Sequence, residues 1–140
     1  MIMVIDFGML LKWKMKTEKC LYTEDHEWVF VEDNSITIGV SNYAVEELGE
    51  VVFVELPETG TELAEKEEFG TIESVKTVSS LYAPTTAIVT EKNTALEQKP
   101  DLINENPYSK GWLLKASIND SASLDNLMSH SDYKAYLETL

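Results

Sequence analysis

The chain is built from short runs of β-branched and aromatic residues separated by turn residues. Two such runs, EWVFV at 27–31 and SITIGV at 35–40, flank the turn sequence EDNS, which predicts a hairpin with Asp33 and Asn34 in its turn. Further strands are expected over 50–56, 67–74, 77–83, 86–92 and 111–118. Strands this short must share one core, so the spacing predicts a small sandwich or barrel.

Helical spacing appears in only a few places. Residues 41–48 predict a short helix with Ser41 as its N-cap and Gly49 at its end, and helical turns are expected near Leu96 and Leu102. The tail is also predicted to be helical, with one apolar group at Leu124, Leu127 and Met128 and a second at Tyr133, Tyr136, Leu137 and Leu140. Its candidate N-caps are Asp120, Ser123 and Asp132. We therefore expect one mainly β domain with flanking helices over 21–140, after an atypical leader of unknown role at 1–20.

The net charge limits the kinds of molecule that we expect this protein to bind. The 140 residues carry a net charge of −14, and all 11 basic residues are lysines. Nucleic acids and anionic membranes require clustered cationic side chains, so both are excluded as expected partners. An acidic body favours encounter with basic faces on partner proteins. We also expect the protein to be a monomer.

The sequence gives only weak signals for export from the cell or insertion into a membrane. Cys20 is the single cysteine, which fits a reducing compartment, and the apolar run near the N-terminus lacks the preceding positive charge of a secretory signal. No segment approaches the roughly 18 apolar residues of a membrane span. The residues predict an intracellular, reducing compartment, which would be the cytoplasm in a bacterium.

Common catalytic motifs are missing from the sequence. The glycines are too scattered for a phosphate-binding loop, and His26 and His130 have no second ligand at metal spacing, so no metal site is expected. Residues 25–27, DHE, could form an acid/base cluster, but a solvated lead-in to a strand is the favoured interpretation. LPETG at 56–60 matches a sortase signal, yet polar globular sequence follows it and a simple turn is favoured.

Lys76 lies in the unusual stretch TIESVKTVSS. The apolar residues Ile72, Val75 and Val78 are separated by odd steps, so a continuous strand pleat is impossible through them. The pattern predicts a reversal centred near residues 74–77, with Lys76 at or beside a hairpin tip and only Glu73 near enough to pair with it. The residues alone leave open whether this lysine is a surface charge or an amine presented to a modifying enzyme.

Several motifs together resemble a known family. The segments YTEDHEWV, IGVSNYAVEELGEVVFVELPETG, ESVKTVSSLYAP and PDLINENPYSKGWLLK, followed by a tyrosine-containing helix, are similar to the glycine cleavage system H-proteins from about Tyr22 to Leu140. The resemblance implies a barrel-sandwich hybrid fold with flanking helices. Residues 1–20 have no counterpart in it.

The resemblance also implies roles for individual residues. Lys76 matches the position that carries lipoic acid in amide linkage, and Glu73 matches an acidic position typical of lipoyl acceptors. Glu27 matches a residue of the cleft in which the arm rests, and Ser80 matches a cleft position where an acidic residue is common. Val78 is bulkier than the usual small residue, and Ala87 replaces a glycine expected in the turn after the proline bend. The departures at Val78, Ser80 and Ala87 are expected to weaken protection of the aminomethyl group while leaving lipoylation intact.

The implied activity is carriage without catalysis. Lipoyl-lysine would form an arm on the order of a dozen ångströms long when extended. Glycine decarboxylase would load it with an aminomethyl group, an aminomethyltransferase would pass the one-carbon unit to tetrahydrofolate, and dihydrolipoamide dehydrogenase would reoxidise the dithiol. A lipoate ligase or lipoyltransferase would attach the cofactor. The alternatives are an H-like carrier that relays lipoate to other proteins and an acidic adaptor without lipoate; an independent enzyme has the least support.

Overall fold

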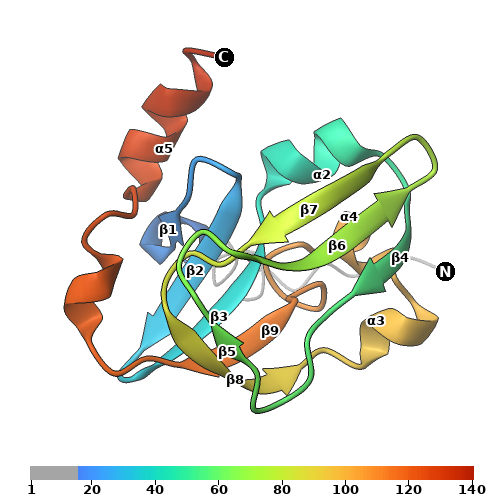
Figure 1. Cartoon of the computed structure of the whole chain (residues 1–140). Helices are drawn as coiled ribbons and strands as arrows, with labels where there is room; N and C mark the ends of the chain where they lie inside the picture. The colour runs from blue at the N-terminus through green and yellow to red at the C-terminus, as the bar shows by residue number, and fades with distance from the viewer. Residues whose placement is uncertain (1–15) are drawn as a thin grey trace, which may run out of the picture.

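The computed structural model describes residues 16–140, a mainly β structure with short helices at its margins (Figure 1). Its strands are β1 (Leu21–Tyr22), β2 (Glu27–Glu32), β3 (Ser35–Val40), β4 (Val51–Glu55), β5 (Glu62–Leu63), β6 (Glu68–Ser74), β7 (Val78–Tyr82), β8 (Ala87–Lys92) and β9 (Leu114–Ser117). Its helices are α2 (Asn42–Leu48), α3 (Ala95–Gln98), α4 (Leu102–Glu105), the 3₁₀ turn η1 (Ser121–Leu124) and α5 (His130–Leu137). The leader predicted at 1–20 lies outside the described residues as far as residue 15.

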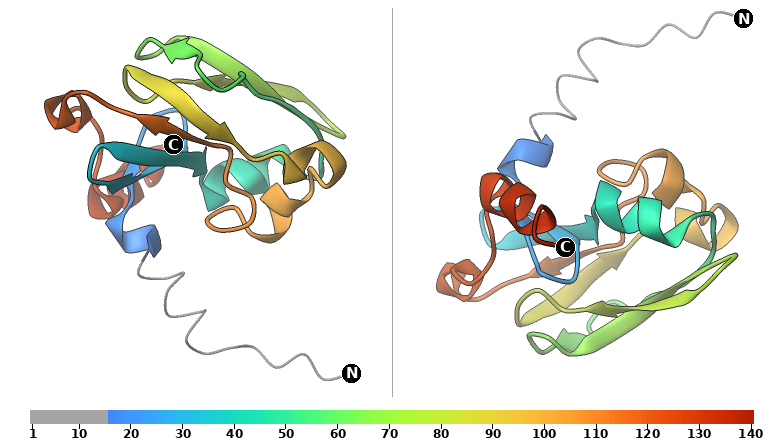
Figure 2. Two further views of the ribbon diagram at one scale, coloured as in Figure 1. Left: turned by 90° about the horizontal axis from the view of Figure 1, so that it is seen from below. Right: turned by 90° about the horizontal axis from the view of Figure 1, so that it is seen from above.

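The strands form two antiparallel sheets, seen as two layers in Figure 2. Six strands lie in the order β1-β2-β3-β9-β8-β5, and three in the order β4-β6-β7. Apolar side chains from both sheets meet between them, and one cluster joins Val40 of the larger sheet to Val51 and Ile72 of the smaller one. The hairpin predicted at Asp33 and Asn34 is confirmed, since β2 pairs with β3 from Glu27–Val40 to Glu32–Ser35.

The predicted helix after β3 is confirmed together with both of its boundaries. Ser41 Oγ accepts the N–H of Ala44, and Gly49 ends α2 with a φ of 76°. The short helices α3 and α4 contain the predicted turns at Leu96 and Leu102. The LPETG stretch forms a turn in which Gly60 has a φ of 92°, as its composition indicated.

The tail differs from the prediction. The 3₁₀ turn η1 ends at Leu124, and helical structure resumes only at His130 in α5. Between them Met128 lies beside β1, exchanging two backbone hydrogen bonds of 2.8 and 2.9 Å with Tyr22. Pairing with an edge strand therefore overrides the helical spacing of Leu127 and Met128. The N-cap of α5 is Ser129, whose Oγ accepts the N–H of Asp132, so the prediction of Asp132 as cap is wrong. Ser123 lies inside η1, where its Oγ donates to the carbonyl of Asp120.

Ala87 lies within the strand predicted over 86–92, but not in the turn that the resemblance implied. It is the first residue of β8, buried in the core at 4% exposure, and is not in a turn. Its φ is negative, so an alanine is accommodated without backbone strain.

Gly70 allows the closest approach between β4 and β6. A Cβ at Gly70 would collide with the main-chain carbonyl oxygen of Glu55. We expect Gly70→Ala to destabilise the fold by about 1–3 kcal/mol, because neither backbone can move without disturbing the sheet. Urea unfolding followed by tryptophan fluorescence measures this, with the exposed Ser79→Ala as the control. Equal midpoints for the two variants would contradict the close contact.

Candidate functional site

Lys76 occupies the tip of the hairpin between β6 and β7, so the predicted reversal is confirmed. β6 ends at Ser74, β7 begins at Val78, and Glu73 pairs with Val78 across the hairpin. The tip projects beside the C-terminal end of α2 (Figure 1). Lys76 is exposed and forms no ion pair within residues 16–140, so Glu73 does not neutralise it.

Ser74 fixes the conformation of this tip. Its side chain is buried, and its Oγ accepts the N–H groups of Lys76 at 3.3 Å and Thr77 at 3.1 Å. The N–H of Ser74 in turn donates to the carbonyl of Thr77 at 2.8 Å. Sequence reasoning missed this role, although a serine two residues before the centre of a reversal is a known turn signal.

A second segment, residues 49–51, contacts the hairpin tip from the side. The N–H of Val75 donates to the carbonyl of Glu50 at 3.0 Å. Asn104 of α4 holds the residues on both sides of Glu50, donating to the carbonyl of Gly49 at 2.8 Å and accepting the N–H of Val51 at 2.9 Å. A Cβ at Gly49 would lie 3.5 Å from Cε of Lys76, so the aliphatic stem of the lysine runs past this glycine. The backbone under Lys76 is therefore held on both sides while its amine stays exposed.

A cleft of about 350 Å³ begins next to this tip. It follows β7, which is the edge strand of the three-stranded sheet, and lies between that strand, α2 and the start of β2. Its lining includes Thr77 and Val78 beside Lys76, and Ser80 and Glu27 farther along. The structure thus brings together the residues that the sequence singled out, with the exception of Glu73, which lies on the exposed face of β6.

Glu27 is buried at one side of the cleft, with 1% of its surface exposed. One carboxylate oxygen accepts the hydroxyl of Thr23 at 2.6 Å, and the other accepts the N–H of Tyr82 at 3.4 Å. Burial raises the pKa of Glu27 to about 8, against the lowering effect of these two hydrogen bonds, and the nearby Asp25 raises it further. The interpretation of residues 25–27 as a solvated lead-in is therefore wrong for Glu27, because β2 carries it into the interior.

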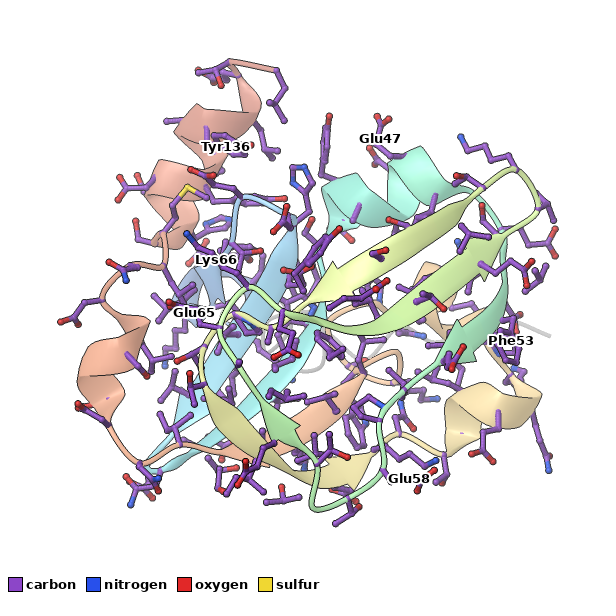
Figure 3. The ribbon with its side chains drawn as sticks, viewed as in Figure 1. Glu47, Phe53, Glu58, Glu65, Lys66 and Tyr136 are labelled. Atoms are coloured by element: carbon purple, nitrogen blue, oxygen red, sulfur yellow. The ribbon has the colours of Figure 1, made fainter. Side chains whose placement is uncertain are left out.

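His26 links the cleft to the C-terminal helix. It has a φ of 71°, and its Nδ1 lies 2.7 Å from the hydroxyl of Tyr133 on α5. The same hydroxyl lies 2.8 Å from Oγ of Ser41, the N-cap of α2. Burial lowers the pKa of His26, so a neutral ring is favoured in this network. Figure 3 shows α5 with Tyr136 and α2 with Glu47 on either side of this region.

Three acidic residues line the cleft. Asp25, Glu27 and Glu47 contribute carboxyl groups to it, and no lysine is among its lining residues. Such a lining suits a ligand that carries an amine. Within residues 16–140 no group of three potential ligands is arranged to hold a metal ion. None of the helices in this part of the chain combines the length and apolar character needed to cross a bilayer.

Comparison with known proteins identifies relatives over most of the chain. The family model described as Glycine cleavage H-protein matches residues 20–140. The glycine cleavage system H protein of Staphylococcus carnosus is 51% identical over 117 residues, covering 84% of this chain and 93% of that protein. The protein of the same name from Geobacillus kaustophilus is 49% identical over 124 residues, covering 88% and 98%.

A solved structure gives the same relationship for the fold. The crystal structure of a glycine cleavage system H protein from Mycobacterium marinum matches with a TM-score of 0.77 and 35% sequence identity. The match covers 86% of this chain and 98% of that one. The expectation of a barrel-sandwich hybrid with flanking helices is confirmed.

The burial of Glu27 predicts a specific pH dependence of stability. The unfolded chain releases this proton near pH 4.5, whereas the folded protein keeps it until about pH 8. The folded state therefore binds more protons in this window, and stability falls as pH rises through it. We expect wild type to lose a few kcal/mol relative to Glu27→Gln between pH 4.5 and 8, at about 1.4 kcal/mol per pKa unit.

Urea unfolding of both proteins at pH 5 and pH 8 measures this difference. Titrating groups that do not interact with Glu27 contribute equally to both proteins and cancel in the comparison. A gap between the two proteins that stays constant with pH would show that Glu27 ionises normally in the fold.

Proposed function

Since this chain belongs to the glycine cleavage H-protein family, and so serves as the non-catalytic carrier of the glycine cleavage system, we propose that Lys76 is the residue that carries its lipoyl group. The observation that supports this most directly is the exposed, unpaired amine on a hairpin tip whose backbone is fixed by Ser74. A modifying enzyme requires both accessibility and a defined position. Lipoic acid bound there would supply a disulfide for redox and group-transfer chemistry.

The cleft beside the tip is proposed as the resting place of the arm. Ser80 is four positions after Lys76, and four steps at a strand rise of about 3.3 Å per residue span at most roughly 13 Å. This matches the reach expected of a lipoyl-lysine side chain. Glu27 and Ser80 would therefore lie where the far end of the arm arrives, and Thr77 and Val78 where it enters.

The acidic lining defines what the cleft would stabilise. Glu27, which is buried, and Asp25, which is exposed, present carboxyl groups that can pair with an amine carried by the arm. Pairing with a cation would also favour the ionised form of Glu27, whose pKa burial has raised to about 8. Ser80 adds a hydroxyl and no charge here, so Glu27 would provide most of the electrostatic stabilisation of an amine at this end of the cleft.

Its proposed partners follow from the carrier role. Glycine decarboxylase, an aminomethyltransferase and dihydrolipoamide dehydrogenase would each receive the arm, and a lipoate ligase or lipoyltransferase would attach it. The acidic body of this protein, with a net charge of −14, favours docking to basic faces around their active sites.

Attachment at Lys76 is tested by intact-mass measurement. Protein produced with a working lipoate ligase and lipoic acid is expected to gain the mass of one lipoyl group. Lys76→Arg should gain none, because a guanidinium does not form the amide. Lys66→Arg is the matched control, since Lys66 is likewise an exposed turn lysine, with a φ of 68° (Figure 3). Modification that persists in Lys76→Arg, or is lost in Lys66→Arg, would show that the site is wrong.

The storage role of the cleft is tested with Glu27→Gln. Fully lipoylated wild type and variant are loaded with glycine and glycine decarboxylase, and the decay of the loaded group is followed by mass. We expect a several-fold shorter lifetime in the variant, because the amide cannot pair with an amine as a carboxylate does. Glu24→Gln, which removes an exposed carboxylate nearby, should behave as wild type. Equal lifetimes for wild type and Glu27→Gln would argue against a resting site at Glu27.

A further inference from the structure

Exposed apolar side chains gather around the hairpin tip. Seven large hydrophobic residues are exposed in the part of the chain that the structure describes, and four of them lie on β4 or the tip: Val52, Phe53, Val75 and Val78. Phe53 is 54% exposed, Val75 66% and Val78 62%. An apolar group of this kind on a small protein indicates a contact surface.

The strand register places three of these positions in one line. Phe53 of β4 pairs with Glu73 of β6, and Glu73 pairs with Val78 of β7. Directly paired residues project from the same face of a sheet, so Phe53, Glu73 and Val78 form a continuous row across all three strands. We refer to these three residues as the tip row; Val75 and Lys76 lie beside it in the turn that joins β6 to β7, and Figure 3 shows Phe53 on the outer strand.

The tip row is distinct from the cleft. Of its residues only Val78 borders the cleft, whereas Phe53 and Glu73 do not line it. Phe53 instead borders a separate hollow of about 310 Å³ between β4 and α3, with Leu56 and Leu96 in its lining. A resting arm would therefore leave Phe53 and Glu73 uncovered.

Charge defines the kind of surface that would complement the row. Glu73 and the neighbouring Glu50 and Glu55 are exposed and take part in no ion pair within residues 16–140. The lysine at the rim of the hollow, Lys92, is already paired with Glu58 at 2.7 Å and lies 3.7 Å from Glu97. The complementary partner has an apolar centre with a basic rim.

We propose that the tip row is the docking surface for the enzyme that acylates Lys76, with Phe53 as a specificity-determining contact. This rests on the proposed attachment at Lys76. In that reaction an amide bond forms between Nζ and the carboxyl carbon of an activated acyl donor, the donor's leaving group departs with its bonding electrons, and the amine loses a proton. The enzyme must cover the tip to bring the donor to Nζ, and the row is the surface that continues directly from the tip.

The test measures steady-state lipoylation of the unmodified protein by lipoate ligase with lipoic acid and ATP. Phe53→Ser is expected to lower kcat/KM at least about tenfold, mainly through KM for the carrier, as for a truncated aromatic contact. Phe53→Leu should recover most of the loss. Ile88→Ser is the matched control: Ile88 is also exposed, at 40%, but lies on β8 of the other sheet and should leave the rate unchanged.

Other outcomes would overturn the assignment. Wild-type lipoylation kinetics for Phe53→Ser contradict it, as does an equal rate loss in Ile88→Ser, when rates are expressed per folded protein as measured by thermal unfolding. Normal lipoylation with impaired loading by glycine decarboxylase would assign the row to that enzyme and would also contradict the proposal. A wild-type protein that gains no lipoyl group at Lys76 would instead refute the attachment itself.

Discussion

The hydrogen bonds of Ser74 are the interaction on which the presentation of Lys76 depends. An amine that is to be modified must be exposed, and exposed hairpin tips have few contacts to order them. Here a buried serine side chain accepts two successive backbone N–H groups, and the carbonyl of Glu50 holds a third. The order comes from hydrogen bonds within the turn and from the neighbouring segment at Glu50. The upper side of the tip is left free for a partner.

The free edge of β7 is the second constraint. An edge strand exposes unpaired N–H and C=O groups that invite pairing with another chain. In this protein α2 and the start of β2 stand beside that edge and leave the cleft between them. Glu27 accepts the N–H of Tyr82, so one buried carboxyl both covers part of the edge and supplies acidity to the cleft. Glu27 must be buried to reach the strand, and this burial raises its pKa.

Local sequence rules predicted the parts of this structure that local forces determine. The hairpin at Asp33 and Asn34, the cap at Ser41 and the reversal at Lys76 depend on residues within a few positions of one another. The prediction failed where distant residues decide the outcome: Met128 pairs with Tyr22, and Glu27 is buried by strands that follow it in the chain. The cleft residues Glu27 and Ser80 were identified by resemblance, whereas Ser74, His26, Tyr133 and Asn104 required the coordinates, because each acts on a partner far away or through a side chain that turn composition does not specify.

The tip row and the cleft both lie next to Lys76 and correspond to two different requirements of a carrier. A carrier has to be recognised by enzymes and also to keep its arm away from water between encounters. The tip row lies on the open face of the three-stranded sheet, and the cleft runs along the edge of the same sheet. Val78 belongs to both, since it ends the row and borders the entrance of the cleft. If the arm rests in the cleft as proposed, an enzyme seated on the row would contact Val78, one of the two residues that the arm passes on leaving, and docking would then be coupled to release of the arm. A bulky residue at this position would strengthen that coupling, because it would fill more of the entrance than a small one.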